Sequence, residues 1–208
     1  MNKKIAQVLH SLEKRAEHEQ KNHTKIHHDE RMLAITRDTG VFYNMLLRVQ
    51  KPKKILEIGT SFGYSTLWFA DAMSKNSKII TIEKNPKKIK FAKNNFRKAG
   101  VSNMIEIKKG IARDVLIQLS KAKSKTQERF DFIFIDADKE EYPFYFDICL
   151  SMLKKDGIIA ADNIIFPRRF KKHIKKYLNH INGIKNIQSI TVPIGNGQEI
   201  SFKKNEKC

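Results

Sequence analysis

Oxygen-bearing side chains follow two apolar segments of this sequence that have the length of buried strands. Asp136 follows the segment FDFIFI, and Asp162 and Asn163 follow the segment GIIAA. Carboxylate and amide oxygens suit a hard cation such as Mg²⁺, which takes few protein ligands and keeps some of its water. These residues therefore predict a divalent-cation site. Taken singly, either acid would also suit the cap of a following helix or loop, and Asp138 fits that role best.

A turn with two glycines follows another apolar segment and leads into a helical pattern. Its sequence is LEIGTSFGYST, in which the glycines are Gly59 and Gly63. Glycine lets a backbone approach a ligand closely, and the first N–H groups of a helix are free to bind an anion. The G-x-x-x-G spacing lacks the third glycine of dinucleotide loops, which disfavours a nicotinamide oxidoreductase. It suits the methionine carboxylate of S-adenosylmethionine, and a plain tight turn without a ligand stays the alternative.

Glu83 ends the next apolar segment after this turn. It follows Gly63 by about 20 residues, the offset at which an acid reaches ribose hydroxyls in nucleotide-binding α/β folds. A single acid at the end of a strand is more often a solvated surface residue, so both interpretations stay open. The glycine turn and Glu83 agree in favouring a cofactor that contains a nucleoside.

These residues need a scaffold, and the sequence alternates short apolar runs with helical patterns from Lys53 onward. Strands are expected at residues 54–58, 78–82, 104–108, 130–135 and 157–161, and helices at residues 64–73, 86–99, 113–119, 140–153 and 168–181. This alternation indicates a doubly wound α/β fold with a parallel sheet. Strands at 187–193 and 199–203 flank a Gly-Asn-Gly turn and predict an antiparallel hairpin at one edge. Ligands of such sheets bind beyond the carboxyl ends of the strands, where the acidic residues described above lie.

The chain of 208 residues has the size of one α/β domain, without internal repeats or a linker. Residues 1–50 are expected to form N-terminal helices, and residues 51–208 a catalytic core. The apolar positions of these helices are Ile5, Val8, Leu9 and Leu12 in the first, and Val41, Met45 and Leu46 in the second. The segment between them contains His23, His27 and His28, for which a solvated surface is favoured over a metal cluster. Residues 121–129 are expected to form a surface loop.

Composition limits the class of protein. No segment has the length of uncharged apolar sequence that a membrane span needs, and the N-terminus has no signal-peptide pattern, so a cytoplasmic protein is expected. The two cysteines, Cys149 and Cys208, indicate neither a disulfide framework nor a thiolate metal site. The net charge of +19 favours a polyanionic partner such as RNA. Only nine of the 41 basic residues are Arg, however, and a compositional bias toward Lys with a solvated surface stays the alternative.

The sequence resembles the cation-dependent O-methyltransferase family, which includes catechol, caffeoyl-CoA and bacterial tRNA hydroxyuridine methyltransferases. The resemblance runs from about Ile35 to Lys204 and is carried by LEIGTSFGYST, ITIEKNP, FDFIFIDADKEEY, GIIAADN and PIGNGQEISFKK, in the family order and spacing. It implies a Rossmann-like, seven-stranded class I methyltransferase fold. It also implies S-adenosylmethionine as the cofactor, Mg²⁺ or another divalent cation, and methyl transfer to a hydroxyl oxygen.

The resemblance implies a set of cofactor-binding residues, namely Ile35, Glu57, Gly59, Thr60, Gly63, Ser65, Glu83, Ala112 and Asp136. Gly59 and Ser65 would hold the methionine portion, with Ser65 on its carboxylate. The backbone near Ile35 would close over that carboxylate. Glu83 would bind the ribose hydroxyls, and Ala112 would line the adenine.

The family assigns the reaction itself to residues that follow the fourth and fifth strands. Asp136 would contact the methionine amino group and would hold the metal ion together with Asp162 and Asn163. Lys139 stands where the family has its general base, so it would take the proton from the acceptor hydroxyl. A salt bridge between Lys139 and one of the two glutamates that follow it is the alternative.

The sequence departs from the family pattern at two places beside the site. Ile111 stands between Gly110 and Ala112 where the family often has Asp, so a polar contact near the adenine is missing. The residues after Asn163 read IIFPRR in place of a glycine-containing loop that borders the acceptor pocket in the family. The acceptor therefore stays open between a hydroxyuridine in tRNA and a small catechol-like phenol. A non-catalytic RNA-binding module is the alternative of another class.

Two considerations favour tRNA as the acceptor. The family has a tRNA-modifying branch, and basic residues follow the second pair of expected metal ligands. These residues are Arg168, Arg169, Lys171, Lys172, Lys175 and Lys176. Such a cluster would grip the phosphates on either side of an extruded base. The family further implies an N-terminal segment that serves as a lid and as a contact in a homodimer.

Overall fold

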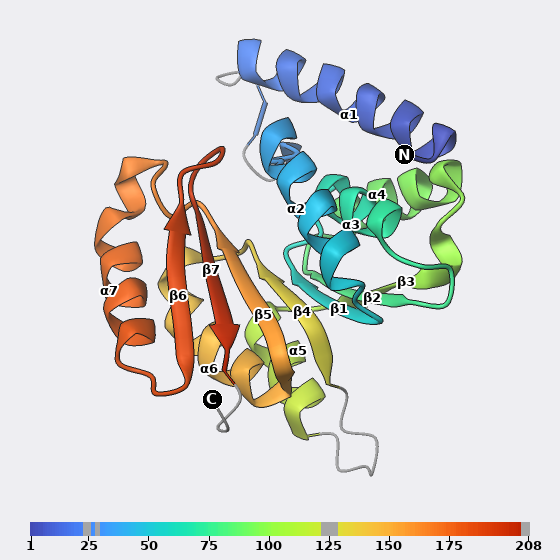
Figure 1. Cartoon of the computed structure of the whole chain (residues 1–208). Coiled ribbons are helices and arrows are strands. Elements are labelled where there is room, and N and C mark those ends of the chain that lie inside the picture. Colours follow the sequence, from blue (N-terminus) through green and yellow to red (C-terminus); the bar gives the residue numbers. More distant parts are fainter. Residues whose placement is uncertain (23–25, 28–29, 122–128, 205–208) are drawn as a thin grey trace.

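A seven-stranded sheet forms the centre of the computed structural model, which describes residues 1–22, 26–27, 30–121 and 129–204 (Figure 1). Its strands are β1 (Lys54–Ile58), β2 (Lys78–Glu83), β3 (Ile105–Lys109), β4 (Phe130–Ile135), β5 (Leu153–Asp162), β6 (Ile187–Val192) and β7 (Gln198–Lys203). The order across the sheet is β3-β2-β1-β4-β5-β7-β6. Strands β1 to β5 run parallel, and β7 pairs antiparallel with both β5 and β6. The predicted doubly wound sheet with an antiparallel hairpin at its edge is thus confirmed.

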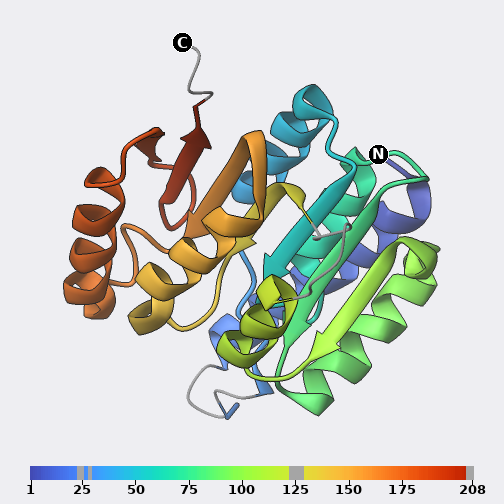
Figure 2. The same ribbon diagram turned by 90° about the horizontal axis from the view of Figure 1, so that it is seen from below.

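Helices cover both faces of this sheet (Figures 1 and 2). One face carries α1 (Lys3–Lys21), α2 (Arg37–Gln50), α3 (Tyr64–Ala72) and α4 (Pro86–Ala99). The other face carries α5 (Ala112–Lys121), α6 (Tyr142–Met152) and α7 (Lys171–Asn182). Successive strand residues point to opposite faces, so neighbours such as Ile55 and Leu56 belong to different buried clusters. His23, His28, Cys208 and most of the loop expected at 121–129 lie outside the described residues.

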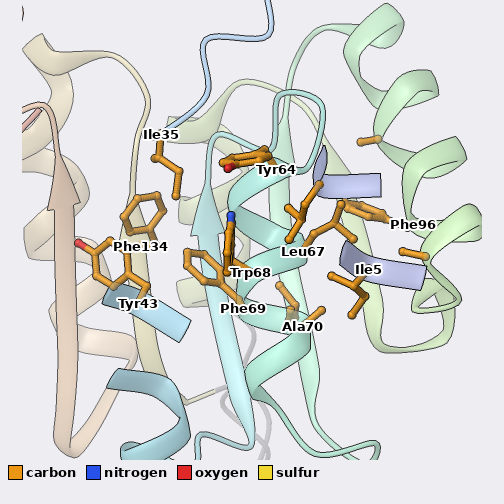
Figure 3. Close-up of a cluster of buried hydrophobic side chains, with 14 of the residues drawn as sticks. Ile5, Ile35, Tyr43, Tyr64, Leu67, Trp68, Phe69, Ala70, Phe96 and Phe134 are labelled. Atoms are coloured by element: carbon orange, nitrogen blue, oxygen red, sulfur yellow. The ribbon is translucent and has the colours of Figure 1, made fainter. Parts of the chain in front are cut away.

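The buried face of α2 differs from the predicted one. Tyr43 and Leu47 are fully buried, whereas Met45 is 64% exposed and Val41 and Leu46 are only partly buried. The Tyr43 ring packs edge-on against aromatic rings of α3 and β4, with centroid distances of 5.1 to 6.0 Å (Figure 3). Apolar residues occur on several sides of this helix, so helical periodicity alone does not select the face that the aromatic cluster buries.

Strand β5 begins earlier than the sequence indicates. Phe130 of β4 pairs with Leu153, but the next paired residue, Phe132, lies opposite Ile158. The residues between these two pairs therefore bulge out of the register. Asp156, in that bulge, has a left-handed backbone with φ of 60°. The charged residues of the bulge resemble a loop in the sequence, which explains the later start that was predicted.

Two of the predicted helices are each preceded by a short 3-10 turn. The helix expected at 140–153 consists of a turn at Lys139–Glu141 followed by α6, and the helix expected at 168–181 consists of a turn at Arg168–Phe170 followed by α7. Asp138 caps the first turn, where its side chain accepts a hydrogen bond of 3.2 Å from the Glu140 N–H. The interpretation of Asp138 as a cap is therefore confirmed.

The strand order reverses between β1 and β4, because the chain first runs outward to β2 and β3 and then returns. Ligands of doubly wound sheets bind at such a switch point. The backbone joins the strand tips there. Asp136 N–H donates to the Ile58 carbonyl at 2.9 Å, and the N–H groups of Gly59 and Thr60 donate to the Ile82 carbonyl at 3.0 and 3.1 Å. The residues that follow β1, β2 and β4 are thus held together.

Candidate active site

The glycine turn packs directly against the residue expected to ligate the metal. Gly59 has φ of 106°, and a Cβ added to it would lie 2.0 Å from the Asp136 carbonyl oxygen. Gly63 has φ of 83°, and a Cβ there would lie 2.3 Å from the Phe96 ring. That these glycines make room for a ligand stays a prediction, and the structure adds a second reason for glycine at both positions. Positive φ and contact with the protein itself exclude a side chain at both positions.

Glu57 lies fully buried under this turn and organises it from inside. Its carboxylate accepts hydrogen bonds from the hydroxyls of Ser65, Thr66 and Thr81 at 2.5 to 2.6 Å. Burial and, to a smaller extent, the charge of Asp136 raise the pKa of Glu57, and the three hydroxyls lower it, so that the pKa is raised to about 7 in all. In this arrangement the Ser65 hydroxyl points to Glu57, so the Ser65 N–H in the first turn of α3 is the group free for an anion.

Glu83, at the end of β2, is held by two backbone groups. Its Oε2 accepts from Ser61 N–H and its Oε1 accepts from Asn85 N–H, both at 2.9 Å. These bonds place a half-buried carboxylate beside the glycine turn, as a ribose-binding role requires. Thr60, also in the expected set, is buried and pairs with the Thr81 hydroxyl at 2.6 Å, so its side chain supports the turn.

The N-terminal segment packs over this turn within the same chain. The buried Glu19 of α1 accepts from Met32 N–H at 2.7 Å, and the Met32 carbonyl accepts from the Ser61 hydroxyl. The Tyr64 hydroxyl donates to Glu13 of α1 at 2.8 Å. Ile35 is also buried, just before α2 begins. These contacts bring the segment that precedes α2 to the glycine turn.

The expected adenine-binding residue, Ala112, lies two residues after a glycine that is bonded to Glu83. Gly110, with φ of 154°, donates its N–H to the Glu83 carbonyl at 3.1 Å and leads into α5, which begins at Ala112. Ala112 is half-buried, whereas Ile111 is 58% exposed. The bond from Gly110 brings the chain that leads into α5 to the end of β2, and the departure at Ile111 presents an apolar side chain to the surface there.

Lys139 pairs with Asp136 and not with the acids that follow it. Its Nζ lies 2.9 Å from the Asp136 Oδ1, and the side chain is almost fully buried. The adjacent acids have other partners, since Glu141 lies 2.5 Å from an arginine of α5 and Glu140 lies 3.4 Å from His173 of α7. The alternative salt bridge predicted for Lys139 is therefore wrong, and the amine lies beside the expected metal ligand.

Asp162 is the second acid of the site. It is 2% exposed and accepts a hydrogen bond from the Gln198 amide. Burial and the nearby charge of Asp136 raise the pKa of the Asp162 carboxyl, whereas the bond from Gln198 and the charge of Lys139 lower it. Asn163 follows at a left-handed backbone position with φ of 64°. Among the described residues no group of three or more His, Cys, Asp or Glu side chains could hold a metal ion, and the expected set of Asp136, Asp162 and Asn163 contains only two residues of these types.

Two residues of the site received no role from the sequence. Gln198 connects Asp162 to α2, because its amide oxygen accepts from the Tyr43 hydroxyl at 2.7 Å. Tyr142 is fully buried and contacts the backbone of both β4 and β5. Both lie within the quoted family segments, FDFIFIDADKEEY and PIGNGQEISFKK. Only their presence in those segments could have marked them as site residues in the sequence. Their hydrogen-bond partners could not be predicted, because these come from distant parts of the chain.

The loop after Asn163 borders the opposite side of the site. Its residues Ile164 and Ile165 donate their N–H groups to the β6–β7 turn at 3.0 and 2.9 Å, and Ile165 and Phe166 are 41% and 47% exposed. The six basic residues that follow are all exposed, and within the described residues none of them has an acidic partner. The His173 contact with Glu140 places the start of α7 beside the turn that carries Lys139.

No helix in the described part of the chain is both long and apolar enough to cross a bilayer.

The chain is similar to known proteins both in sequence and in fold. The family model described as O-methyltransferase matches residues 8–192. A catechol O-methyltransferase of Niastella koreensis is 39% identical over 133 residues, which are 64% of this chain and 59% of that protein. Caffeoyl-CoA O-methyltransferase 5 of Nicotiana tabacum is 31% identical over 185 residues, which are 82% of this chain and 77% of that protein.

Among solved structures, the O-methyltransferase from Bacillus cereus in complex with SAH superposes with a TM-score of 0.80 at 26% identity. The superposition covers 98% of this chain and 92% of that one. The match to the family model spans most of the chain and includes β1 to β5 with Asp136, Lys139 and Asp162. The chain therefore belongs to the O-methyltransferase family.

Proposed function

We propose that this protein transfers a methyl group from S-adenosylmethionine to a hydroxyl oxygen and that the reaction requires a divalent cation. Asp136, Lys139 and the Gly59 turn lie together at the switch point of the sheet, and this observation is the main support for the proposal. A cofactor-binding turn, a carboxylate and a buried amine at one point are what this reaction needs. A non-catalytic RNA-binding module would not require them together.

The residues of the chain can complete such a transfer. The methyl group of a sulfonium is already activated, so the task is to present an ionised hydroxyl in line with the S–CH₃ bond. The S–C bond breaks as the O–C bond forms, and the electron pair stays on sulfur as a thioether. Lys139 accepts the hydroxyl proton when its amine is neutral, and the ammonium that forms stays paired with Asp136, which holds Nζ in place.

The cation would be held by Asp136, Asp162 and Asn163. The donor set fits, because burial and the charge of Asp136 both disfavour ionised Asp162, and a cation between them would offset both effects. When bound, Mg²⁺ would favour ionisation of the acceptor hydroxyl and would fix its place. Gln198, which is itself bonded to Tyr43, holds Asp162, and the glycine turn packs against the backbone of Asp136.

Loss of the Glu83 carboxylate is expected to weaken S-adenosylmethionine binding by about 1 to 3 kcal/mol, because charge-assisted hydrogen bonds to the ribose disappear. The measurement is calorimetric titration of Glu83→Ala. Glu106→Ala, which removes an exposed glutamate of β3, is the matched control and should bind like the parent. Circular dichroism checks the fold, because Glu83 also accepts two backbone hydrogen bonds. Unchanged affinity in a folded Glu83→Ala protein would show that the ribose is held elsewhere.

For the acceptor, we propose a hydroxyl of RNA, namely a hydroxyuridine in tRNA, with a small catechol-like phenol as the alternative. The support is the row of exposed basic residues Arg168, Arg169, Lys171, Lys172, Lys175 and Lys176. This row starts beside the turn that carries Lys139, so phosphates bound there would lie next to the reacting groups. The names of the catechol and caffeoyl-CoA relatives support the alternative.

The acceptor is tested by offering labelled cofactor with unmodified tRNA, hydroxyuridine-containing tRNA and catechol. We expect transfer to the hydroxyuridine tRNA alone. If four basic residues contact phosphates, log affinity should fall with log salt with a slope of about −3 to −4. Changing Lys175 and Lys176 to Glu should weaken RNA binding, whereas Lys93→Glu with Lys98→Glu on α4 should not. Transfer to catechol, with no transfer to RNA and no salt-sensitive RNA binding, would contradict the RNA proposal and leave O-methyl transfer in place.

A homodimer and a cytoplasmic location stay predictions. The exposed Met45 and Val49 on one side of α2, 64% and 82% accessible, support the homodimer, because they offer an apolar surface in the N-terminal helices.

A further inference from the structure

Tyr142 lies where the pairing between β4 and β5 ends. It is fully buried at the start of α6. Its hydroxyl lies 3.2 Å from the carbonyl oxygen of Ile135 and 3.1 Å from that of Asp162. The last residues that pair between the two strands are Ile135 and Ala161. The hydroxyl therefore ties the strands together just beyond their own ladder, where the two metal-binding aspartates emerge.

The ring of Tyr142 also faces the proposed general base. The Lys139 Nζ lies 5.0 Å from the centroid of this ring, a distance at which an ammonium is attracted to an aromatic face. The same Nζ donates to Asp136 at 2.9 Å. One side chain thus contacts the strand end that precedes Asp136, the backbone of Asp162 and the amine of Lys139.

Buried aromatic side chains pack against the ring of Tyr142 and fix its position. Tyr177 of α7 meets it edge-on, with centroids 5.4 Å apart and an interplanar angle of 82°. Phe146 of α6 packs against Tyr177 in turn at 5.9 Å, and all three rings are fully buried. A close-packed aromatic group cannot shift without displacing its neighbours. The place of the Tyr142 hydroxyl is consequently set by the core and not by the loops around the site.

We propose that Tyr142 is a positioning residue, whose hydroxyl sets the separation of Asp136 and Asp162 and whose ring sets the place of the Lys139 amine. The inference rests on the proposed function, in which the two aspartates share a cation. A small cation demands near-ideal ligand placement. Residues that contact metal ligands and orient them, without binding the metal themselves, typically contribute about 10- to 100-fold to metal affinity or activity.

The test is Tyr142→Phe, which keeps the ring and removes only the hydroxyl. Mn²⁺ alone is the probe, and its free fraction is followed by electron paramagnetic resonance. We expect Tyr142→Phe to bind Mn²⁺ about 10-fold more weakly than the parent. Its kcat should fall, while its affinity for S-adenosylmethionine, measured without metal, should stay within about twofold because the glycine turn is intact. A purely structural role would instead lower the melting temperature without this selective loss.

Tyr177→Phe is the matched control. It removes a buried hydroxyl that has no hydrogen-bond partner among the described residues and keeps the ring that packs on Tyr142. It should bind Mn²⁺ like the parent. Parent-like Mn²⁺ affinity in Tyr142→Phe would overturn the proposal.

The parent protein separates this inference from the proposed function. A parent that transfers methyl groups but binds no Mn²⁺ would overturn both this inference and the metal requirement. A parent that binds Mn²⁺ but transfers no methyl group would contradict only the proposed activity.

Should Tyr142→Phe fail to fold, 4-fluorophenylalanine at position 142 takes its place. Its fluorine fills much of the space of the hydroxyl but cannot donate a hydrogen bond to either carbonyl, so we expect Mn²⁺ affinity to drop by about the same 10-fold. Affinity equal to that of the parent would again overturn the proposal.

Discussion

Lys139→Ala is expected to lower the rate of methyl transfer by about 10² to 10⁴, with little change in cofactor affinity, because the reaction loses its general base. In the structure the amine is almost fully buried and bonded to Asp136, and the neighbouring glutamates are engaged elsewhere. Lys139→Arg should not restore the rate, because a guanidinium cannot accept the proton. Single-turnover transfer from labelled cofactor separates this effect from changes in product release.

The matched control for Lys139 is Lys154→Ala. Lys154 also pairs with an aspartate, Asp131, at 2.7 Å, but it lies in the bulge of β5 away from the strand tips. Its loss should leave the rate unchanged. In Lys139→Ala the residual rate should rise with pH, because the acceptor hydroxyl then ionises without help. A near-normal rate in Lys139→Ala or in Lys139→Arg would return Lys139 to the role of a structural ion-pair partner of Asp136.

The parts of the fold that depend on local pattern follow from the sequence. Strands β1, β2 and β4 consist of apolar runs that are buried on both faces, and helical periodicity separates them from the next run, so β1 and β4 match their predicted bounds. The parts that depend on distant contacts do not follow. The side of α2 that is buried is selected by the fit of Tyr43 among rings of α3 and β4, and the start of β5 depends on its register with β4.

The candidate site shows the same division. Asp136 and Asp162 can be found from the sequence because each lies at a strand end, and strand ends of a parallel sheet meet at one edge. Lys139 can be found only through the resemblance to the family, which has its general base three residues after the first expected metal ligand. Tyr142 and Gln198 have no such marker. Gln198 lies 36 residues from Asp162 and 155 residues from Tyr43, the two side chains that it joins. Only the folded arrangement of the hairpin against β5 and α2 reveals that connection.

Removal of divalent cations with EDTA is expected to abolish methyl transfer, and added Mg²⁺ should restore it, because the acceptor hydroxyl then loses the charge that favours its ionisation. Asp162→Ala should have the same effect as EDTA and should not respond to added Mg²⁺. The reason is specific to the site. Asp162 is a buried carboxylate near Asp136. In Asp162→Ala the cation would keep only Asp136 and Asn163 as protein ligands. The rate is measured with labelled cofactor at saturating acceptor.

Asp138→Asn is the matched control for the metal ligands. Asp138 is exposed, lies two residues from Asp136 and caps the turn at Lys139–Glu141, and asparagine caps equally well. This variant should need and bind Mg²⁺ like the parent. A second readout does not depend on turnover, because an ion that binds only the folded protein raises its melting temperature, by an amount that grows with ion concentration. The parent and Asp138→Asn should show this rise and Asp162→Ala should not. Full activity in EDTA, or an Asp162→Ala protein as active as the parent, would contradict the metal requirement, and methyl transfer would then depend on Lys139 and the orientation of the bound substrates alone.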